Sequence, residues 1–342
     1  MKAKDGIKYA LSFGVAAVLL WFSFRNVEWS QFWMALKSCS WGFVLLSMLI
    51  GVASFFFRAV RWKMLLDPLD PSLRLGPVFN AINISYLVNM VIPRGGDVIR
   101  NVYIAKHSET GPDGHKKASF EKALGTAVLD RLWDGVVMIL LFIVVLGLMW
   151  SRYGSFVTET LLGSVAAKRN TALVLAGLAV VGLLAVWALY HYRERNPLAG
   201  KIWHFVRGLG EGLLSCLKMK SAWKFAVYTL LVWGCYWMMS ATIIWAVQGI
   251  DPAVLGGQAS GLTALQQLGL PDALFLCLVG AVSTLVPVPG GFGAFHYVVS
   301  LALSAIYGIP MEIGIIFATL SHESQAITQM LCGAVSYGLE MK

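Results

Sequence analysis

The sequence predicts an all-α polytopic membrane protein built from two inverted-topology repeats. Of its 342 residues, 58% are hydrophobic and 13% are charged, whereas a soluble domain carries roughly 25% charged residues. Several windows reach about 20 apolar residues, enough to cross a hydrocarbon core of about 30 Å. Two further apolar segments, one in each half, are interrupted by proline and paired glycine.

Six apolar windows have the length of full transmembrane helices. They lie at about 7–24, 41–60, 132–150, 171–190, 223–248 and 311–337. The longest polar stretch, 94–122, is shorter than the usual domain minimum of about 50 residues. We therefore expect a single transmembrane domain over 1–342, with an uncleaved first helix.

The two interrupted segments are residues 89–100 and 285–293. Their prolines and glycines are Pro93, Gly95 and Gly96 in the first, and Pro287, Pro289, Gly290, Gly291 and Gly293 in the second. Broken backbone at membrane depth persists only where protein or a water-filled cavity satisfies its amides. Matching interruptions in two halves are typical of a transporter binding site.

Charge asymmetry predicts the topology. With a cytoplasmic N-terminus, 20 of the Lys and Arg residues that flank the spans lie inside and 5 lie outside, a strong positive-inside bias. Segment 75–92 has basic residues on both flanks, so we expect a hairpin that dips in from the cytoplasm. Segment 249–271 has no Lys or Arg, so the second hairpin is expected to dip from outside.

Each half then has three crossings and one re-entrant hairpin. Because three is odd, repeat two (about 171–338) is inverted relative to repeat one (about 7–150), and both termini are cytoplasmic. Six full transmembrane helices plus two hairpins are expected, and an eight-span bundle is the alternative.

Charged residues surround the first break. Asp97 and Arg100 are spaced i,i+3 if a helix starts after Gly96. Free amides at that helix start, with Arg94 and Arg100 nearby, would favour an anion.

Two further charged groups flank the spans. Asp130, Arg131 and Asp134 are spaced for a local ion-pair cluster, which either braces a helix end or has a functional role. Arg58 and Arg61 share one helical face, and the simplest interpretation of either one is an interfacial cation.

Glu323 is the strongest anomaly, because it lies about midway along the last predicted span. A carboxylate there costs about 2.5–3.5 kcal/mol and usually marks a pathway. His322, His296 or an arginine of the first half could be its partner. The HExxH motif of zinc proteases is incomplete here, because Ala326 stands in the place of the second histidine. We expect no metal site, no cofactor and no enzymatic activity.

The stretch 198–220 combines apolar residues at helical spacing with basic residues. It suits an interfacial helix on an anionic leaflet, and a loop helix packed on the bundle is the alternative.

Four strings, at 57–62, 89–100, 129–134 and 287–296, resemble the membrane region of lysylphosphatidylglycerol synthases and their stand-alone, flippase-like relatives. The resemblance covers nearly the whole chain. It implies translocation of an anionic, aminoacylated or polyprenyl-linked lipid across the cytoplasmic (inner) membrane. This chain departs from the pattern at Asp97, Asp130, His296 and the His322–Glu323 pair. Because the soluble transferase domain of the synthases is absent, lipid synthesis is not expected.

We therefore predict a lipid flippase whose partners are membrane lipids with anionic head groups. The residues expected to line or brace its substrate site are Arg58, Arg61, Asn89, Arg94, Gly95, Gly96, Asp97, Arg100, Asp130, Arg131, Asp134, Pro289, Gly290, Gly291, His296, His322 and Glu323. The net charge of +9 reflects cytoplasmic loops, so no nucleic acid partner is expected. A homodimer is one option for the assembly. An ion-coupled transporter of a small solute and an accessory membrane subunit for glycolipid synthesis are the alternative functions.

Overall fold

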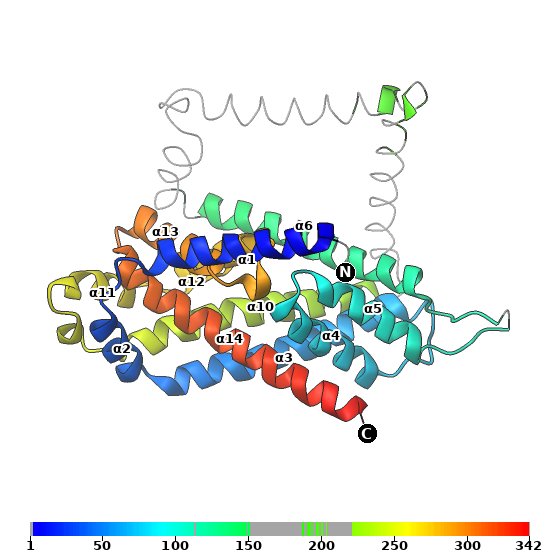
Figure 1. Ribbon diagram of the computed structural model, residues 1–342, viewed down its shortest axis with the longest axis horizontal. Coiled ribbons are helices and arrows are strands. Elements are labelled where there is room, and N and C mark those ends of the chain that lie inside the picture. The colour runs from blue at the N-terminus through cyan, green and yellow to red at the C-terminus, as the bar shows by residue number, and fades with distance from the viewer. Residues whose placement is uncertain are drawn as a thin grey trace. The chain divides into compact units, whose positions relative to one another are not determined.

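The computed structural model describes residues 3–112, 114–148 and 221–341 (Figure 1). Between the last two ranges it also describes residues 150, 187, 190–192, 194, 196, 197, 200 and 203. These parts of the chain are helices and loops, with one isolated β-bridge between Thr110 and Lys116, so the all-α prediction is confirmed. The chain divides into two units, residues 1–130 with 223–342 and residues 131–222.

Five of the six predicted spans correspond to helices. These are α1 (Ala3–Phe24), α3 (Trp41–Leu66), α6 (Phe120–Leu148), α10 (Ala222–Val247) and α14 (Met311–Glu340). The predicted span at 171–190 and the predicted basic helix at 198–220 lie outside the described residues, apart from isolated positions.

Within the described residues, three helical segments are long and apolar enough to cross a membrane: α3, α10 and Pro289–Tyr307. Two bent helix pairs raise the number to five if each counts as one span. The six-span count of the inverted-repeat topology therefore stays a prediction.

The bent pairs contain short helices that the sequence did not predict. The segment Leu11–Phe24 of α1 meets α2 (Trp29–Ser38) at 88°, and Pro252–Gln266 meets α12 (Leu270–Ser283) at 100°. The second bend contains η3 (Pro252–Gln258) and α11 (Ala259–Gln266). Each of these short helices has fewer than the roughly 12 residues that an apolar pattern needs to indicate a helix on its own.

The first interrupted segment forms the helix pair α4 (Leu75–Val91) and α5 (Gly95–His107). Pro93 disfavours helical backbone at Ile92, which is extended at φ −114° and ψ 105°. The helices pack so closely that a Cβ at Gly96 would lie 1.9 Å from the carbonyl oxygen of Ser85. Only glycine therefore allows this approach.

The second interrupted segment connects α12 to α13 (Ala294–Tyr307) through the short 3-10 helix η4 (Pro289–Gly291). Gly290, Gly291 and Gly293 have φ values of 57°, 81° and 79°. Side chains with a Cβ rarely adopt such angles, so glycine at these positions permits the reversal of the chain.

Both helix pairs are hairpins, because the ends of each pair lie together. Before α4, Asp70 accepts hydrogen bonds from Ser108 Oγ at 2.6 Å and from the Glu109 amide at 2.8 Å, both just beyond α5. At the start of α12, Asp272 accepts from the Tyr307 hydroxyl at the end of α13, at 3.0 Å. The predicted hairpins are thus observed, and the sides of the membrane from which they enter stay a prediction.

Helix α14 contacts α1, α3, α4, α11 and α13 and so joins the two halves of the first unit. The η4 turn contacts α4, and a Cβ at Gly290 would lie 3.0 Å from the Met90 sulfur. The second break therefore packs against the end of the helix that precedes the first break. The two interrupted segments of the sequence thus lie close together in the fold.

The order of elements around the two breaks is similar but not identical. The broken pair α4–α5 follows α3 directly, whereas η3 and α11 lie between α10 and the broken pair α12–α13. A helix of 29 or 30 residues (α6 or α14) comes after each broken pair. The two repeats and their inverted relation stay a prediction.

Candidate functional site

The predicted site residues of the first unit form three groups. The first, which we call the arginine network, contains Arg58, Arg61, Asp97, Arg100 and Asp130, together with Tyr236. The second is the first break, residues 92–96. The third is the second break, residues 287–293, with a histidine–glutamate cluster of His296, His322 and Glu323.

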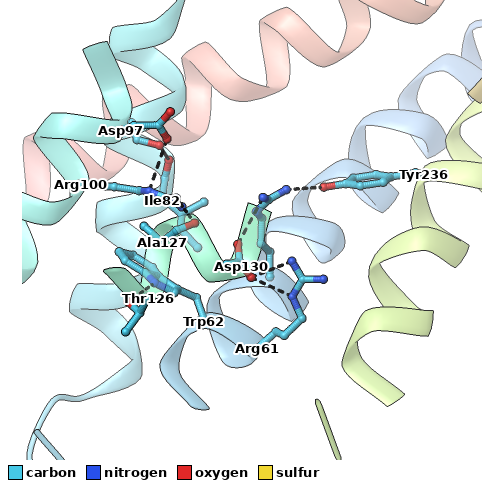
Figure 2. A network of polar contacts seen from close by, with 11 residues as sticks. Arg61, Trp62, Ile82, Asp97, Arg100, Thr126, Ala127, Asp130 and Tyr236 are labelled. Atoms are coloured by element: carbon cyan, nitrogen blue, oxygen red, sulfur yellow. Dashed lines mark hydrogen bonds and ion pairs between the residues drawn. The ribbon is translucent and has the colours of Figure 1, made fainter. Parts of the chain in front are cut away.

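Asp130 of α6 is the centre of the arginine network (Figure 2). Its carboxylate is fully buried, and Arg61 donates to Oδ1 from Nε at 3.0 Å and from Nη2 at 2.7 Å. Arg58 Nη2 donates to Oδ2 at 3.3 Å. Removing the partner of a buried ion costs about 3–5 kcal/mol. These contacts therefore decide whether Asp130 can be buried at all.

Arg100 of α5 occupies the other end of the network. Its guanidinium lies 4.7 Å from the ring centre of Trp62, and its Nε lies 3.6 Å from Asp97 Oδ1. Nη2 donates to the Ala127 carbonyl at 3.4 Å, and Trp62 Nε1 donates to Thr126 Oγ1 at 3.0 Å. The i,i+3 spacing of Asp97 and Arg100 on α5 thus brings the two charged groups together. Because Arg100 is 2% exposed, it positions α5 on α3 and α6.

Tyr236 of α10 is a network residue that the sequence analysis missed. Its hydroxyl accepts a hydrogen bond from Arg58 Nη1 at 3.0 Å, which links the second half of the chain to α3 (Figure 2). A buried tyrosine usually places its hydroxyl on a polar partner. The position of this tyrosine in the middle of an apolar span could therefore have indicated a polar partner from the sequence alone.

Arg94 is the exposed cation of the first break. It precedes α5 in the left-handed conformation, at φ 60° and ψ 4°. It is also the one non-glycine residue with positive φ within the described part of the chain. Arg94 and Arg100 were predicted to act together on an anion, but the fold buries Arg100 and leaves Arg94 exposed.

The amides of the first break are already occupied. Gly95 N donates to the Ile92 carbonyl at 2.9 Å, and Gly96 N donates to Asn89 Oδ1 at 2.8 Å. Neither of these two amides is free to hold an anion, because their hydrogen bonds close the turn between α4 and α5. Asn89 and both glycines shape the break that presents Arg94.

Gly290 of the second break turns its carbonyl toward the histidine–glutamate cluster. His322 Nε2 donates to Gly290 O at 3.0 Å, and a Cβ at Gly291 would lie 3.3 Å from the same nitrogen. Pro289 is buried and begins the turn. The break therefore positions the imidazole ring of His322 on α14.

Glu323 has the two histidines as its partners. Oε1 lies 3.3 Å from His296 Nε2 and 3.2 Å from His322 Nδ1. The prediction that Glu323 requires a partner is confirmed, and of the candidates considered, the histidines take that place. Two imidazoles and a carboxylate are also a donor set that divalent metals use.

Arg131 and Asp134 follow Asp130 on α6 and belong to the second unit. They continue the helix beyond the network, and their predicted site role stays a prediction.

A cavity of about 430 Å³ lies elsewhere in the first unit. Its lining includes Arg25, Asn26, Tyr297 and Glu312, from α13, α14 and the end of α1. No predicted site residue lines it.

Comparison with known proteins identifies one family. The family model for the lysylphosphatidylglycerol synthase TM region matches residues 9–333. No curated protein and no solved structure matches the chain.

Proposed function

Because this chain belongs to the lysylphosphatidylglycerol synthase transmembrane family, we propose that it translocates an anionic lipid across the cytoplasmic membrane. In this proposal Arg94 contacts the head-group phosphate. One observation carries it: an exposed arginine with no hydrogen-bond or ion-pair partner among the described residues lies at the tip of a broken helix pair. The protein moves the lipid and does not modify it chemically.

The backbone at Arg94 favours glycine. A residue with a Cβ loses about 1–2 kcal/mol in the left-handed conformation, and glycine adopts it without that loss. Strained residues of this kind concentrate at ligand sites, where their side chains are used. The side chain of Arg94 makes no hydrogen bond or ion pair with the described residues. Its guanidinium is therefore available to a ligand.

The surroundings of Arg94 favour an amphiphilic ligand. Val91 and Ile92, just before it, are 64% and 39% exposed, and Val98 on α5 is 51% exposed. A guanidinium can bind a phosphate through two parallel hydrogen bonds, and acyl chains would cover the exposed apolar side chains. A small soluble anion would satisfy the cation and leave that apolar surface uncovered.

The arginine network holds the break in place. Arg100 anchors α5 on Trp62 and Ala127, and Arg58 connects Asp130 to Tyr236 of α10. We assign these arginines to positioning, because their contacts are within the protein. Arg94 is the residue that we assign to the lipid.

Reconstituted vesicles test this function. The full chain is inserted with head-group-labelled phosphatidylglycerol, and the movement of label between leaflets is measured. Arg94→Gly keeps the backbone conformation and removes the guanidinium, so we expect transport to slow about tenfold or more, the effect of losing a charge-assisted hydrogen bond. Arg94→Lys keeps the charge without the two-point contact, so an intermediate rate is expected.

Arg74→Ala is the matched control, because Arg74 is also an exposed arginine that immediately precedes a helix. It should transport at the wild-type rate. Equal rates for wild type and Arg94→Gly would remove Arg94 from the mechanism, and no protein-dependent movement of label would reject lipid translocation.

A small polar solute is the second candidate substrate, favoured by the cavity of about 430 Å³ that Arg25, Asn26 and Glu312 line. Under this alternative the vesicles would show no lipid movement and would accumulate a soluble solute, and Glu312→Gln would reduce that uptake.

A further inference from the structure

We propose that His296, His322 and Glu323 bind a divalent transition-metal ion with zinc-like preferences. The site lies where η4 and the start of α13 meet the middle of α14. The inference is independent of the lipid proposal, since it rests on different residues and predicts a different measurement.

Two of the three distances between the ligand atoms match those of a tetrahedral metal site. Zinc bonds of about 2.0–2.1 Å at tetrahedral angles place neighbouring ligand atoms about 3.3 Å apart. Glu323 Oε1 lies 3.3 Å from His296 Nε2 and 3.2 Å from His322 Nδ1. The three groups offer ligand atoms that all lie within 4.8 Å of one another.

The hydrogen bond of His322 orients a lone pair toward the site. Nε2 lies 3.0 Å from the Gly290 carbonyl, and only an N–H can donate to that oxygen. A neutral ring then directs the Nδ1 lone pair at a carboxylate oxygen 3.2 Å away. Two acceptors at that distance require a cation between them, either a proton carried by one of the two groups or a metal ion.

The Gly290 carbonyl is a typical outer partner of a metal-binding histidine. Such histidines usually donate their second N–H to a carbonyl or carboxylate, which fixes the ring orientation. The positive φ values of Gly290 and Gly291 bring this carbonyl to the ring. The broken backbone of the second hairpin is thereby explained as a support for His322.

His296 supplies the second imidazole. Its side chain is 2% exposed, and its Nδ1 is buried without a hydrogen-bond partner among the described residues. The described contacts at Nδ1 therefore do not force the ring into the tautomer that protonates Nε2. With the proton on Nδ1, Nε2 offers its lone pair to the same point as His322 and Glu323.

The walls of the site are aromatic on one side and open on the other. The rings of Phe292 and Phe295 lie 4.9 and 5.3 Å from His322, and Phe24 lies 5.7 Å from His296. Glu323 is 36% exposed, so one side of the cluster is accessible. Three protein ligands with an accessible fourth position are typical of metal sites that bind a further ligand.

Metal binding to the full-length, tag-free protein in detergent tests the inference. After chelator treatment, the protein is titrated with Zn²⁺, and with Co²⁺ as a spectroscopic probe. We expect one bound equivalent per chain and a rise in the unfolding temperature with Zn²⁺. His296→Ala, His322→Ala and Glu323→Gln should each weaken Zn²⁺ binding by about 100-fold.

His107→Ala is the matched control. His107 lies 3.3 Å from Glu340, a similar histidine–glutamate pair, and it lies outside the one three-ligand group among the described residues. Its loss should leave stoichiometry and affinity unchanged. If a ligand variant does not fold, His322→Gln replaces it with a side chain of similar polarity.

Two results would overturn the proposal. One is a folded wild-type protein that binds no stoichiometric Zn²⁺ or Co²⁺, which leaves a proton as the cation between His322 and Glu323. The other is equal metal binding by wild type and by the variants of His296, His322 and Glu323.

Discussion

Both breaks contain proline and paired glycine, but they present opposite kinds of group. At the first break, one left-handed residue, Arg94, turns the chain and exposes a cation. At the second break, three glycines with positive φ form the turn, and the carbonyl of Gly290 is directed at His322 beside Glu323.

This difference between the two breaks shows that a proline–glycine break does not by itself specify a ligand. At the first break the two glycine amides are satisfied within the turn, so its chemistry comes from a side chain. At the second break the backbone supports residues of α14, the helix that follows α13. The two breaks have thus taken different chemical roles.

The open ends of the two hairpins are more alike than their tips. Each is closed by one buried aspartate, Asp70 or Asp272, that joins the start of the first helix to the end of the second. Asp70 accepts hydrogen bonds from Ser72, Ser108 and Glu109. Asp272 accepts from Tyr307 and from the Gly269 amide.

The largest effect is expected from adding a methyl group at the breaks. Gly96→Ala places a Cβ 1.9 Å from the Ser85 carbonyl oxygen, so the free energy of unfolding should fall by about 4 kcal/mol or more. Gly293→Ala places a Cβ 2.6 Å from the Ala16 carbonyl oxygen at φ 79° and should cost about 3 kcal/mol.

Unfolding titrations in mixed detergent micelles would measure both variants. Gly125→Ala on α6 is the control, because no described atom lies within 4 Å of the place that its added methyl group would occupy. This control should stabilise the helix by up to about 1 kcal/mol. A Gly96→Ala protein as stable as wild type would contradict the close packing of α4 and α5.

The next largest effect is expected at the base of the first hairpin. Burial raises the pKa of Asp70, but the hydrogen bonds from Ser108, Ser72 and the Glu109 amide outweigh burial and lower the pKa to about 2. Because this is below the ordinary value of 3.8, the stabilisation is complete above about pH 4 and is lost as the pH falls toward 2.

Asp70→Asn should therefore lower the free energy of unfolding by about 2 kcal/mol at neutral pH. The difference from wild type should shrink below about pH 4, which unfolding titrations across the pH range would detect. Asp67→Asn, at an aspartate whose side chain is 44% exposed, is the control and should lower the free energy of unfolding by less at neutral pH. A constant difference at all pH values would refute the assigned role of the Asp70 carboxylate.

The smallest effect is expected at the base of the second hairpin. Tyr307→Phe removes one hydrogen bond of 3.0 Å to Asp272 and should cost about 1 kcal/mol. Tyr337→Phe is the control, since Tyr337 is 53% exposed. If Tyr307→Phe lowers the free energy of unfolding more than Asp70→Asn does, the expected ranking of the two hairpin ends is wrong.

Much of the fold was predictable because its signals are local. The apolar windows predicted α3, α10 and α14, and the proline–glycine strings located both breaks to within a few residues. The sequence analysis missed Asp70, Tyr236 and Asp272, since each forms hydrogen bonds with residues that lie distant in sequence. Short helices such as α2 were missed because ten residues carry too little periodicity.

Apolar length, the fixed backbone angle of proline and the conformational freedom of glycine determine the membrane class, the helical content and the places where helices break. These properties act between neighbours in the chain, so they can be read directly from it. The packing of helices decided that Arg94 is exposed while Arg100 is buried, and that Glu323 of α14 meets His296 of α13. Burial and pairing depend on which faces of distant helices meet, and no local pattern encodes that choice.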